Sequence, residues 1–220
     1  MSTVEIPKLL DDAYIFPDPY KATDHGLLAW GGDLSLKRLL SAYQNGIFPW
    51  YSKNDPILWW SPNPRLVLFP QDFKVSKSLK KSRKKFTIRY NTSFKEVIST
   101  CKELRQDTWI SDAMKKAYIS LHVKGHAKSI ECYQNEKLVG GLYGVVIGSV
   151  FCGESMFSTV SDASKVALWV LCEQMSKSGG DFIDCQMPTD HLLSLGAVAI
   201  DRKDYLKMLY TCKGKRVELF

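Results

Sequence analysis

Two carboxylates lie in segments that otherwise have the composition of apolar β-strands. Glu154 is the only charged residue in SVFCGESMF, and Asp184 is the only charged residue in FIDCQ, where Gln186 follows two residues later. A carboxylate in a buried strand is unfavourable unless it is paired, so residues of this kind mark candidate sites. The alternative is that each carboxylate ends its strand and caps the next helix. Both interpretations are left open at this point.

The positive charge of the chain is concentrated in one short segment. The 220 residues include 30 Lys and Arg against 23 Asp and Glu, a net charge of +7. Segment 74–85 holds seven of the basic and none of the acidic residues, so the rest of the chain is neutral. A basic cluster without acidic partners attracts a polyanion, although many charged runs are simply solvated. We expect contact with nucleic acid through Lys77, Lys80, Lys81, Arg83 and Lys84.

Motifs for several other chemistries are missing. His122 and His126 have the spacing of a metal pair on a helix, but Gly125 lies between them and is expected to end that helix. Neither G-x-S-x-G nor G-x-x-x-x-G-K occurs, and the six cysteines form no C-x-x-C pair. We therefore expect no metal site and no cofactor.

The hydropathy of the sequence predicts no membrane-spanning helix. The longest uncharged stretch, 138–153, has 16 residues, whereas a membrane-spanning helix needs roughly 20 apolar residues. Residues 1–12 lack the basic and then apolar pattern of a secretory signal. We expect a cytoplasmic protein whose cysteines are reduced.

The first part of the chain, residues 1–62, is expected to form a small N-terminal domain. Proline and glycine punctuate it, so we predict mostly loops. One helix is predicted from residue 36, capped by Asp33 or Ser35 and ended by Asn45-Gly46. A linker at 61–64 leads to the second domain.

The second part, residues 63–220, alternates between strand and helix patterns. Ser93 and Glu96 form a capping-box pattern before one helix, and Asn135-Glu136 is a hairpin-turn pattern between two strands. An antiparallel meander followed by a helix and a further strand is typical of an α+β sheet domain. The predicted strands cover 65–69, 86–90, 127–133, 137–146, 149–157 and 181–186, and the predicted helices cover 74–85, 94–104, 112–124, 162–178, 189–195 and 201–210.

Several motifs, in collinear order, resemble those of the bacterial leucyl/phenylalanyl-tRNA–protein transferase family. They are GLLAWGGDLS (26–35), AYQNGIFPWYS (42–52), DPILWWSPNPR (55–65), GESMFS (153–158) and IDCQ (183–186). The resemblance implies a GNAT-like acyltransferase domain, with a mixed, mainly antiparallel sheet flanked by helices, and a small N-terminal domain. It also implies transfer of Leu or Phe, and less well Met, from aminoacyl-tRNA to the N-terminal Arg or Lys of acceptor proteins. This transfer marks the acceptors for N-degron degradation.

The resemblance also assigns roles to individual residues. Asp184 and Gln186 match the catalytic pair, with Glu154 in the same site, and Trp50 and Trp109 match tryptophans around the tRNA end and the substrate. The apolar pocket for the transferred side chain matches Leu142, Phe151, Met156 and Ile183. The chain departs from the family where Met, Phe and Phe are expected, at Leu142, Leu171 and Met175. The ranking of Leu, Phe and Met donors is therefore left open. The implied partners are Leu-tRNA, Phe-tRNA and the acceptor proteins, and we expect a monomer.

The chemistry of this reaction is consistent with these residue types. An aminoacyl ester is already activated, so neither ATP nor metal is needed, and an attacking α-amine has a reference pKa of roughly 7.7–8.0. A neutral amide is a very weak base, so we expect the Gln186 carbonyl to orient the amine while Asp184 stabilises developing charge. Asp184 and Glu154 would also attract the cationic side chain of the acceptor. A ribose hydroxyl could relay the proton, and the sequence does not decide between these routes.

Two other interpretations can be distinguished from this one. An acetyl-CoA-dependent acetyltransferase of the same fold needs a glycine-containing pyrophosphate loop at a helix N-terminus, and VSDAS, before the long helix, contains no glycine. A plain RNA-binding module, using the basic segment and stacking tryptophans, leaves Glu154 and Asp184 unexplained.

Overall fold

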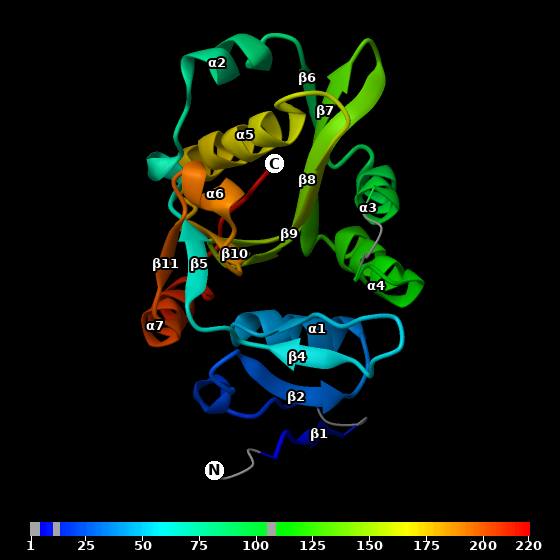
Figure 1. Ribbon diagram of the computed structural model, residues 1–220, viewed down its shortest axis with the longest axis vertical. Coiled ribbons are helices and arrows are strands. Elements are labelled where there is room, and N and C mark those ends of the chain that lie inside the picture. The colour runs from blue at the N-terminus through cyan, green and yellow to red at the C-terminus, as the bar shows by residue number, and fades with distance from the viewer. Residues whose placement is uncertain (1–4, 11–13, 105–108) are drawn as a thin grey trace.

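The chain forms two sheets, a smaller one from its first 60 residues and a larger one from the remainder (Figure 1). The computed structural model describes residues 5–10, 14–104 and 109–220. The predicted α+β class is confirmed, as is the mixed, mainly antiparallel sheet flanked by helices. The predicted domain boundary at 62–63 falls in the connection between the two sheets and stays a prediction.

The smaller sheet has four short strands and one helix. Its strand order is β1 (Lys8–Leu9), β2 (Leu27–Gly31), β4 (Leu58–Trp60) and β3 (Phe48–Pro49). Helix α1 (Leu36–Gln44) begins and ends as predicted, with Ser35 as its N-cap and Asn45 as its C-cap. Most of the other described residues of this segment lie in loops and turns, as predicted, but its four short strands were not predicted. Each strand has only two to five residues, too few for a clear period-two alternation.

The larger sheet has seven strands in the order β11-β5-β10-β9-β8-β7-β6. β7 (Ala127–Gln134), β8 (Lys137–Ile147) and β9 (Val150–Ser158) form the predicted antiparallel meander. β10 (Phe182–Gln186) is parallel to β9, and the other neighbouring pairs are antiparallel. The remaining strands are β5 (Arg65–Leu68), β6 (Thr87–Tyr90) and β11 (Val198–Ile200), the last of which was not predicted.

Helices cover both faces of the larger sheet (Figure 1). α3 (Phe94–Glu103), α4 (Asp112–Val123) and α7 (Arg202–Cys212) share one hydrophobic cluster with one face and with the smaller sheet, whereas α5 (Ala163–Ser178) packs on the other face. The short helices are α2 (Lys77–Arg83), α6 (Asp190–Ser194) and two 3-10 turns, η1 (Pro19–Lys21) and η2 (Pro70–Asp72). The smaller sheet and the main domain therefore share a continuous core.

Glycine allows α5 to lie close against β8. A Cβ atom on Gly140 would lie 2.4 Å from the Cβ of Ala163, the first residue of α5. A Cβ atom on Gly144 would lie 2.4 Å from the Phe151 ring. Close packing therefore accounts for these two glycines of the GGLYGVVIG segment.

The basic helix is shorter than the predicted span 74–85. α2 covers only Lys77–Arg83, because the Ser76 hydroxyl caps it by accepting a hydrogen bond from the Leu79 backbone N–H at 3.1 Å. Leu79 is buried against the α5 side of the core, while the lysines of α2 point to solvent. The amphipathic character of the segment is therefore confirmed over about two turns.

The capping box predicted at Ser93 does not form. α3 begins after Ser93 as expected, but the Ser93 hydroxyl is hydrogen-bonded to the Tyr133 hydroxyl at 2.7 Å. The buried carboxylate of Glu131, on β7, instead accepts from the backbone N–H groups of Thr92 and Ser93 at 3.3 and 3.5 Å. A carboxylate from a distant strand supplies this cap, which a local motif cannot reveal.

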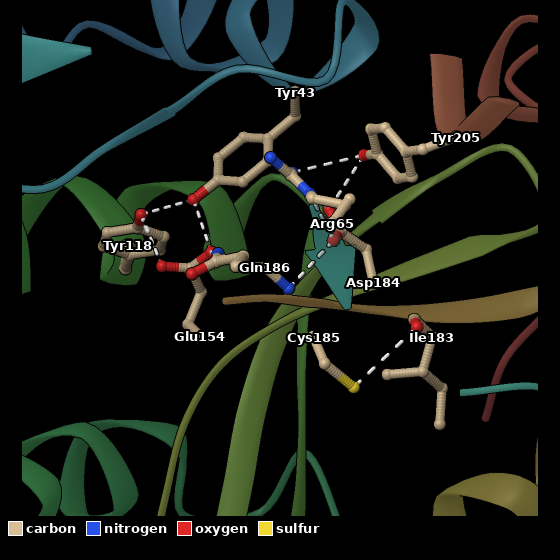
Figure 2. A network of polar contacts seen from close by, with 9 residues as sticks. All are labelled: Tyr43, Arg65, Tyr118, Glu154, Ile183, Asp184, Cys185, Gln186 and Tyr205. Atoms are coloured by element: carbon tan, nitrogen blue, oxygen red, sulfur yellow. Dashed lines mark hydrogen bonds and ion pairs between the residues drawn. The ribbon is translucent and has the colours of Figure 1, made fainter. Parts of the chain in front are cut away.

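Two irregularities in strand pairing occur at the two carboxylates singled out above. β9 and β10 are paired over only three residues each, ending at Cys152 and Asp184. The register between β8 and β9 shifts so that Glu154 has no partner, and the register between β5 and β10 shifts between Asp184 and Gln186. Bulges of this kind redirect side chains, and here they face Glu154 and Gln186 toward each other (Figure 2).

Candidate active site

Glu154 is buried in a network of hydroxyl groups (Figure 2). Tyr43, from α1, contacts its Oε1 at 2.6 Å, and Tyr118, from α4, contacts its Oε2 at 2.9 Å. The two tyrosine hydroxyls are 2.5 Å apart. Gln186, on β10, donates its Nε2 to Oε1 at 2.7 Å. The network therefore joins the N-terminal segment, the α4 face and the two diverging strands.

Burial and hydrogen bonding act in opposite directions on Glu154. Tyr43 donates its hydroxyl to Oε1 and Tyr118 donates its hydroxyl to Oε2, and both bonds favour the charged carboxylate. Burial raises the pKa of Glu154 to about 7, and the hydrogen bonds from the tyrosines only partly offset this effect.

Asp184 is held in a buried ion pair. Arg65, on β5, donates Nε to Oδ1 at 2.8 Å and Nη2 to Oδ2 at 2.7 Å. Tyr205, on α7, donates to Oδ2 at 2.8 Å, and the backbone N–H of Gln186 donates to Oδ1 at 3.0 Å. A carboxylate has about four acceptor positions, and these four donors occupy them. Neither Asp184 nor Glu154 caps a helix, so the alternative structural interpretation is wrong for both.

Gln186 connects the two carboxylates. Its φ of 64° lies in the left-handed region, which a non-glycine residue adopts only where its surroundings enforce it. Asp184 fixes its backbone N–H and Glu154 fixes its side-chain nitrogen. Its side-chain carbonyl oxygen accepts no hydrogen bond from the described residues, so this oxygen remains available to a substrate donor.

An apolar cavity of about 230 Å³ opens beside Gln186 and Glu154. It lies between the diverging strands and the helices α5 and α6, whose contributions include Leu168, Leu171 and Leu192. Of the three departures from the family, Leu142 and Leu171 line the cavity and Met175 does not. The four residues predicted for the side-chain pocket all line it: Leu142, Phe151, Met156 and Ile183. Their role in binding stays a prediction.

The two tryptophans predicted near the substrate do not line this cavity. Trp50 is 38% exposed, and its ring meets that of Trp60 edge-on with centroids 5.6 Å apart. Trp109 is partly buried against the main hydrophobic cluster. The Tyr51 and Ser111 hydroxyls, 3.4 Å apart, join the segments that carry the two tryptophans. Their contact with the tRNA end stays a prediction.

The basic residues predicted to bind tRNA form an exposed surface on α2 and its C-terminal end. Lys77, Lys80, Lys81 and Lys84 are exposed, whereas Arg83 is partly buried. The Ser82 hydroxyl donates to Asp162 at 2.8 Å, which links α2 to the start of α5. The geometry leaves these lysine side chains accessible to a polyanion, and their contact with tRNA stays a prediction.

His122 and Cys185 are packed against neighbouring protein groups. The His122 ring stacks on Phe94 with centroids 4.2 Å apart, and its Nδ1 lies 2.9 Å from the Ala127 carbonyl oxygen. Cys185 lines the cavity, and burial raises the pKa of its thiol well above its usual range. Over the described ranges, no group of three or more His, Cys, Asp or Glu side chains is arranged to hold a metal ion. No helix in these ranges has the length and hydropathy to span a membrane.

Four residues of the network were not found from the sequence: Tyr43, Arg65, Tyr118 and Tyr205. Arg65 carried a usable signal, because it is the only charged residue in the predicted apolar strand RLVLF. A buried cation in one strand and a buried carboxylate in another are natural partners. The tyrosines carried no such signal, since a tyrosine on an amphipathic helix is equally compatible with ordinary packing.

Family models and curated relatives match this chain over most of its length, and they point to the same family. Residues 67–210 match the family model described as leucyl/phenylalanyl-tRNA protein transferase, and residues 32–63 match that of its N-terminal domain. Two curated relatives are named leucyl/phenylalanyl-tRNA–protein transferase. The one from Sulfurimonas denitrificans is 54% identical, and the match covers 93% of this chain and 92% of the relative. The one from Legionella pneumophila is also 54% identical, and the match covers 90% of this chain and 91% of the relative. Among solved structures, a GCN5-related N-acetyltransferase from Kribbella flavida matches with a TM-score of 0.39 and 11% identity, covering 72% of this chain and 58% of that chain.

Proposed function

The chain belongs to the leucyl/phenylalanyl-tRNA–protein transferase family, and on this premise we propose that it transfers Leu or Phe, and less well Met, from aminoacyl-tRNA to an N-terminal Arg or Lys. The family consists of aminoacyltransferases, so the chain is an enzyme of that class. The proposed product is an acceptor protein extended by one residue through a peptide bond, which would enter N-degron degradation.

One observation carries the proposal: an apolar cavity ends at the fixed side-chain amide of Gln186. A Leu or Phe side chain in the cavity would hold the ester carbonyl carbon of the donor near this amide. At about 230 Å³, the cavity is smaller than the roughly 300–1,000 Å³ of pockets for drug-sized ligands. Its size suits one side chain rather than a whole nucleoside.

In the proposed reaction, Gln186 orients the attacking amine. The amine would donate a hydrogen bond to the free side-chain carbonyl oxygen of Gln186, which directs its lone pair at the ester carbon. The carbon–nitrogen bond forms, the carbon–oxygen bond to the ribose breaks, and the proton of the amine ends on the ribose oxygen. Glu154 supports this step by holding the Gln186 nitrogen, which keeps the carbonyl oxygen directed away from it.

The same geometry favours a positioning role for Asp184 over the expected stabilisation of developing charge. Arg65 neutralises Asp184, and all of its acceptor positions are in use. Its contribution would be to fix the backbone of Gln186 in the left-handed conformation. Asp184 would therefore act on the substrate through Gln186 rather than by contact.

We expected Asp184 and Glu154 to attract the cationic side chain of the acceptor, and their surroundings give this expectation little support. Asp184 is already paired with Arg65, and Glu154 is largely protonated below a pH of about 7. The proposed choice of Arg or Lys therefore rests on family membership. We also retain a cytoplasmic location, a monomer and the absence of any cofactor as parts of the proposal.

Transfer of labelled leucine tests the proposed function directly. Leu-tRNA is incubated with the protein and with peptides that begin with Arg, Lys or Ala, and acetyl-CoA replaces Leu-tRNA in a parallel set. We expect label on the Arg and Lys peptides alone, and no acetylation. Acetylation without leucyl transfer would favour the acetyltransferase, and binding of Leu-tRNA without transfer would favour an RNA-binding module.

A further inference from the structure

A second hollow, the basic groove, lies beside the apolar cavity with α6 between them. Its volume is about 550 Å³. In and next to α6, Thr189 and Leu192 line the apolar cavity, whereas His191 and Ser194 line the basic groove. The groove is also lined by Lys74, Ser76, Asp162 and Lys165. The two hollows therefore share a wall one helix thick.

The floor of the basic groove is fixed by close backbone packing. The backbone N–H of Lys74 donates to the Leu195 carbonyl oxygen at 2.9 Å. Gly196 has a φ of +107°, and a Cβ atom there would lie 2.2 Å from the Asp72 carbonyl oxygen. Because only glycine permits this approach, the segment before α2 is held against the end of α6. The groove is therefore present before any ligand binds.

The basic groove contains lysine ammonium groups that can still donate hydrogen bonds to an anion. Lys165 contacts Asp162 at 3.3 Å with its side chain 40% exposed, and an ammonium group has three donors. The other oxygen of Asp162 accepts from Ser82, so this carboxylate is already engaged. Lys74 is exposed. Burial, and secondarily Lys165, lowers the pKa of His191, which adds a neutral imidazole to the rim.

The position of the groove suits a strand that leaves the apolar cavity toward α2. Lys165 lies one turn before Leu168 on α5, so that helix contributes to both hollows. Ser76 and Leu79, at the start of α2, line the opposite side of the groove, and the exposed lysines of α2 follow. A chain of phosphates passing from the cavity to α2 would therefore meet Lys165 and Lys74 first.

We infer that the basic groove binds the phosphodiester groups next to the acylated 3′ end of the donor RNA, with Lys165 and Lys74 as the contacts. This inference rests on the proposed function, because it takes the apolar cavity as the site of the transferred side chain. It assigns a distinct task to the groove: holding the last nucleotides of the donor so that the ester lies at Gln186.

Short donors that differ in phosphate number test this inference. Transfer to a peptide beginning with Arg is measured with leucyl-adenosine, which has no phosphate, and with leucyl-CpA, which has one. For Lys165→Gln we expect kcat/KM to fall about tenfold with leucyl-CpA, the scale of one hydrogen bond to a charged group, and less than about twofold with leucyl-adenosine. Lys165→Arg should keep most of the activity with both donors.

The controls separate phosphate binding from structural effects. Lys177→Gln changes the same charge at the far end of α5 and should alter neither donor, and Lys74→Gln, at an exposed position, should repeat the selective loss. An equal loss with both donors, or no loss in either groove variant, would overturn the inference. Failure of the unmodified protein to transfer leucine from any donor, Leu-tRNA included, would instead overturn the proposed function.

Discussion

Arg65 and Asp184 form a bidentate ion pair in which both side chains are 1% exposed. The pair joins β5 to β10, and Asp184 in turn holds the backbone N–H of Gln186. A neutralised carboxylate therefore sets the conformation of the residue that we propose to orient the amine. We therefore expect substitutions in this pair to change both the stability of the fold and the rate of transfer.

Asp184→Ala should lower both the stability of the fold and the rate of transfer. Leaving Arg65 buried without its partner costs about 3–5 kcal/mol of unfolding free energy, and loss of the Gln186 anchor should reduce single-turnover transfer at least ~100-fold. Urea unfolding and rapid-mixing transfer assays measure the two effects. The double variant Arg65→Met with Asp184→Leu should regain much of the stability but not the rate. A near-normal rate in folded Asp184→Ala protein would contradict the role given to Asp184.

The stability of the protein should carry a pH dependence that comes from Glu154. Its pKa is raised from 4.5 to about 7 in the folded chain, so the protonated form is favoured by folding. This contribution is fully present below pH ~4.5, the unfolded pKa, and is lost as the pH rises to about 7, at a scale of about 3 kcal/mol. Urea unfolding of wild type and Glu154→Gln measures it, because Gln does not titrate. The stability of the wild type relative to this variant should fall between pH 4.5 and 7.5, and a constant difference would contradict a raised pKa.

Enlarging the apolar cavity should shift the choice of donor toward the larger side chain. Met156 lines the cavity, so Met156→Ala should raise the ratio of Phe to Leu transfer, by up to roughly 10-fold, since apolar pockets discriminate single methylenes by only about 1–3 kcal/mol. Competition between Phe-tRNA and Leu-tRNA measures this ratio. Met175→Ala removes similar volume from α5 outside the cavity and should leave the ratio unchanged. An unchanged ratio in Met156→Ala would exclude Met156 from the binding site.

The lysines of the α2 surface should contribute a salt-dependent part of tRNA affinity. Each phosphate neutralised adds about 0.7–0.9 to the slope of log affinity against log salt. Replacing Lys80, Lys81 and Lys84 with Ala should therefore weaken binding and reduce the slope by up to roughly two units. The loss should be similar for different tRNAs, since phosphate contacts do not read bases. The matched control replaces three lysines in and after α7: Lys203, Lys207 and Lys213. Equal slopes in the two triple variants would mean that the α2 lysines are only solvated.

The sequence by itself determined the local and compositional features of this protein. Hydrophobic periodicity located α5 and the β7–β9 meander, because these elements are long and strongly patterned. Chemical contrast located Glu154 and Asp184, since a lone carboxylate in an apolar strand needs a partner wherever that strand lies. The family motifs then brought together four apolar residues of one cavity that are spread over 42 positions of the chain, from Leu142 to Ile183.

The tertiary structure decided what those residues contact. Tyr43 and Tyr118 meet at Glu154 although 75 positions separate them, and Arg65 reaches Asp184 across 119 positions. No local pattern encodes such contacts, because they depend on how strands and helices pack. The short strands of the N-terminal sheet and the Glu131 cap of α3 were hidden for the same reason: each is stabilised by a partner distant in sequence. The four donors around Asp184 are also the reason that we propose a positioning role for it, in place of the expected stabilisation of charge on the substrate.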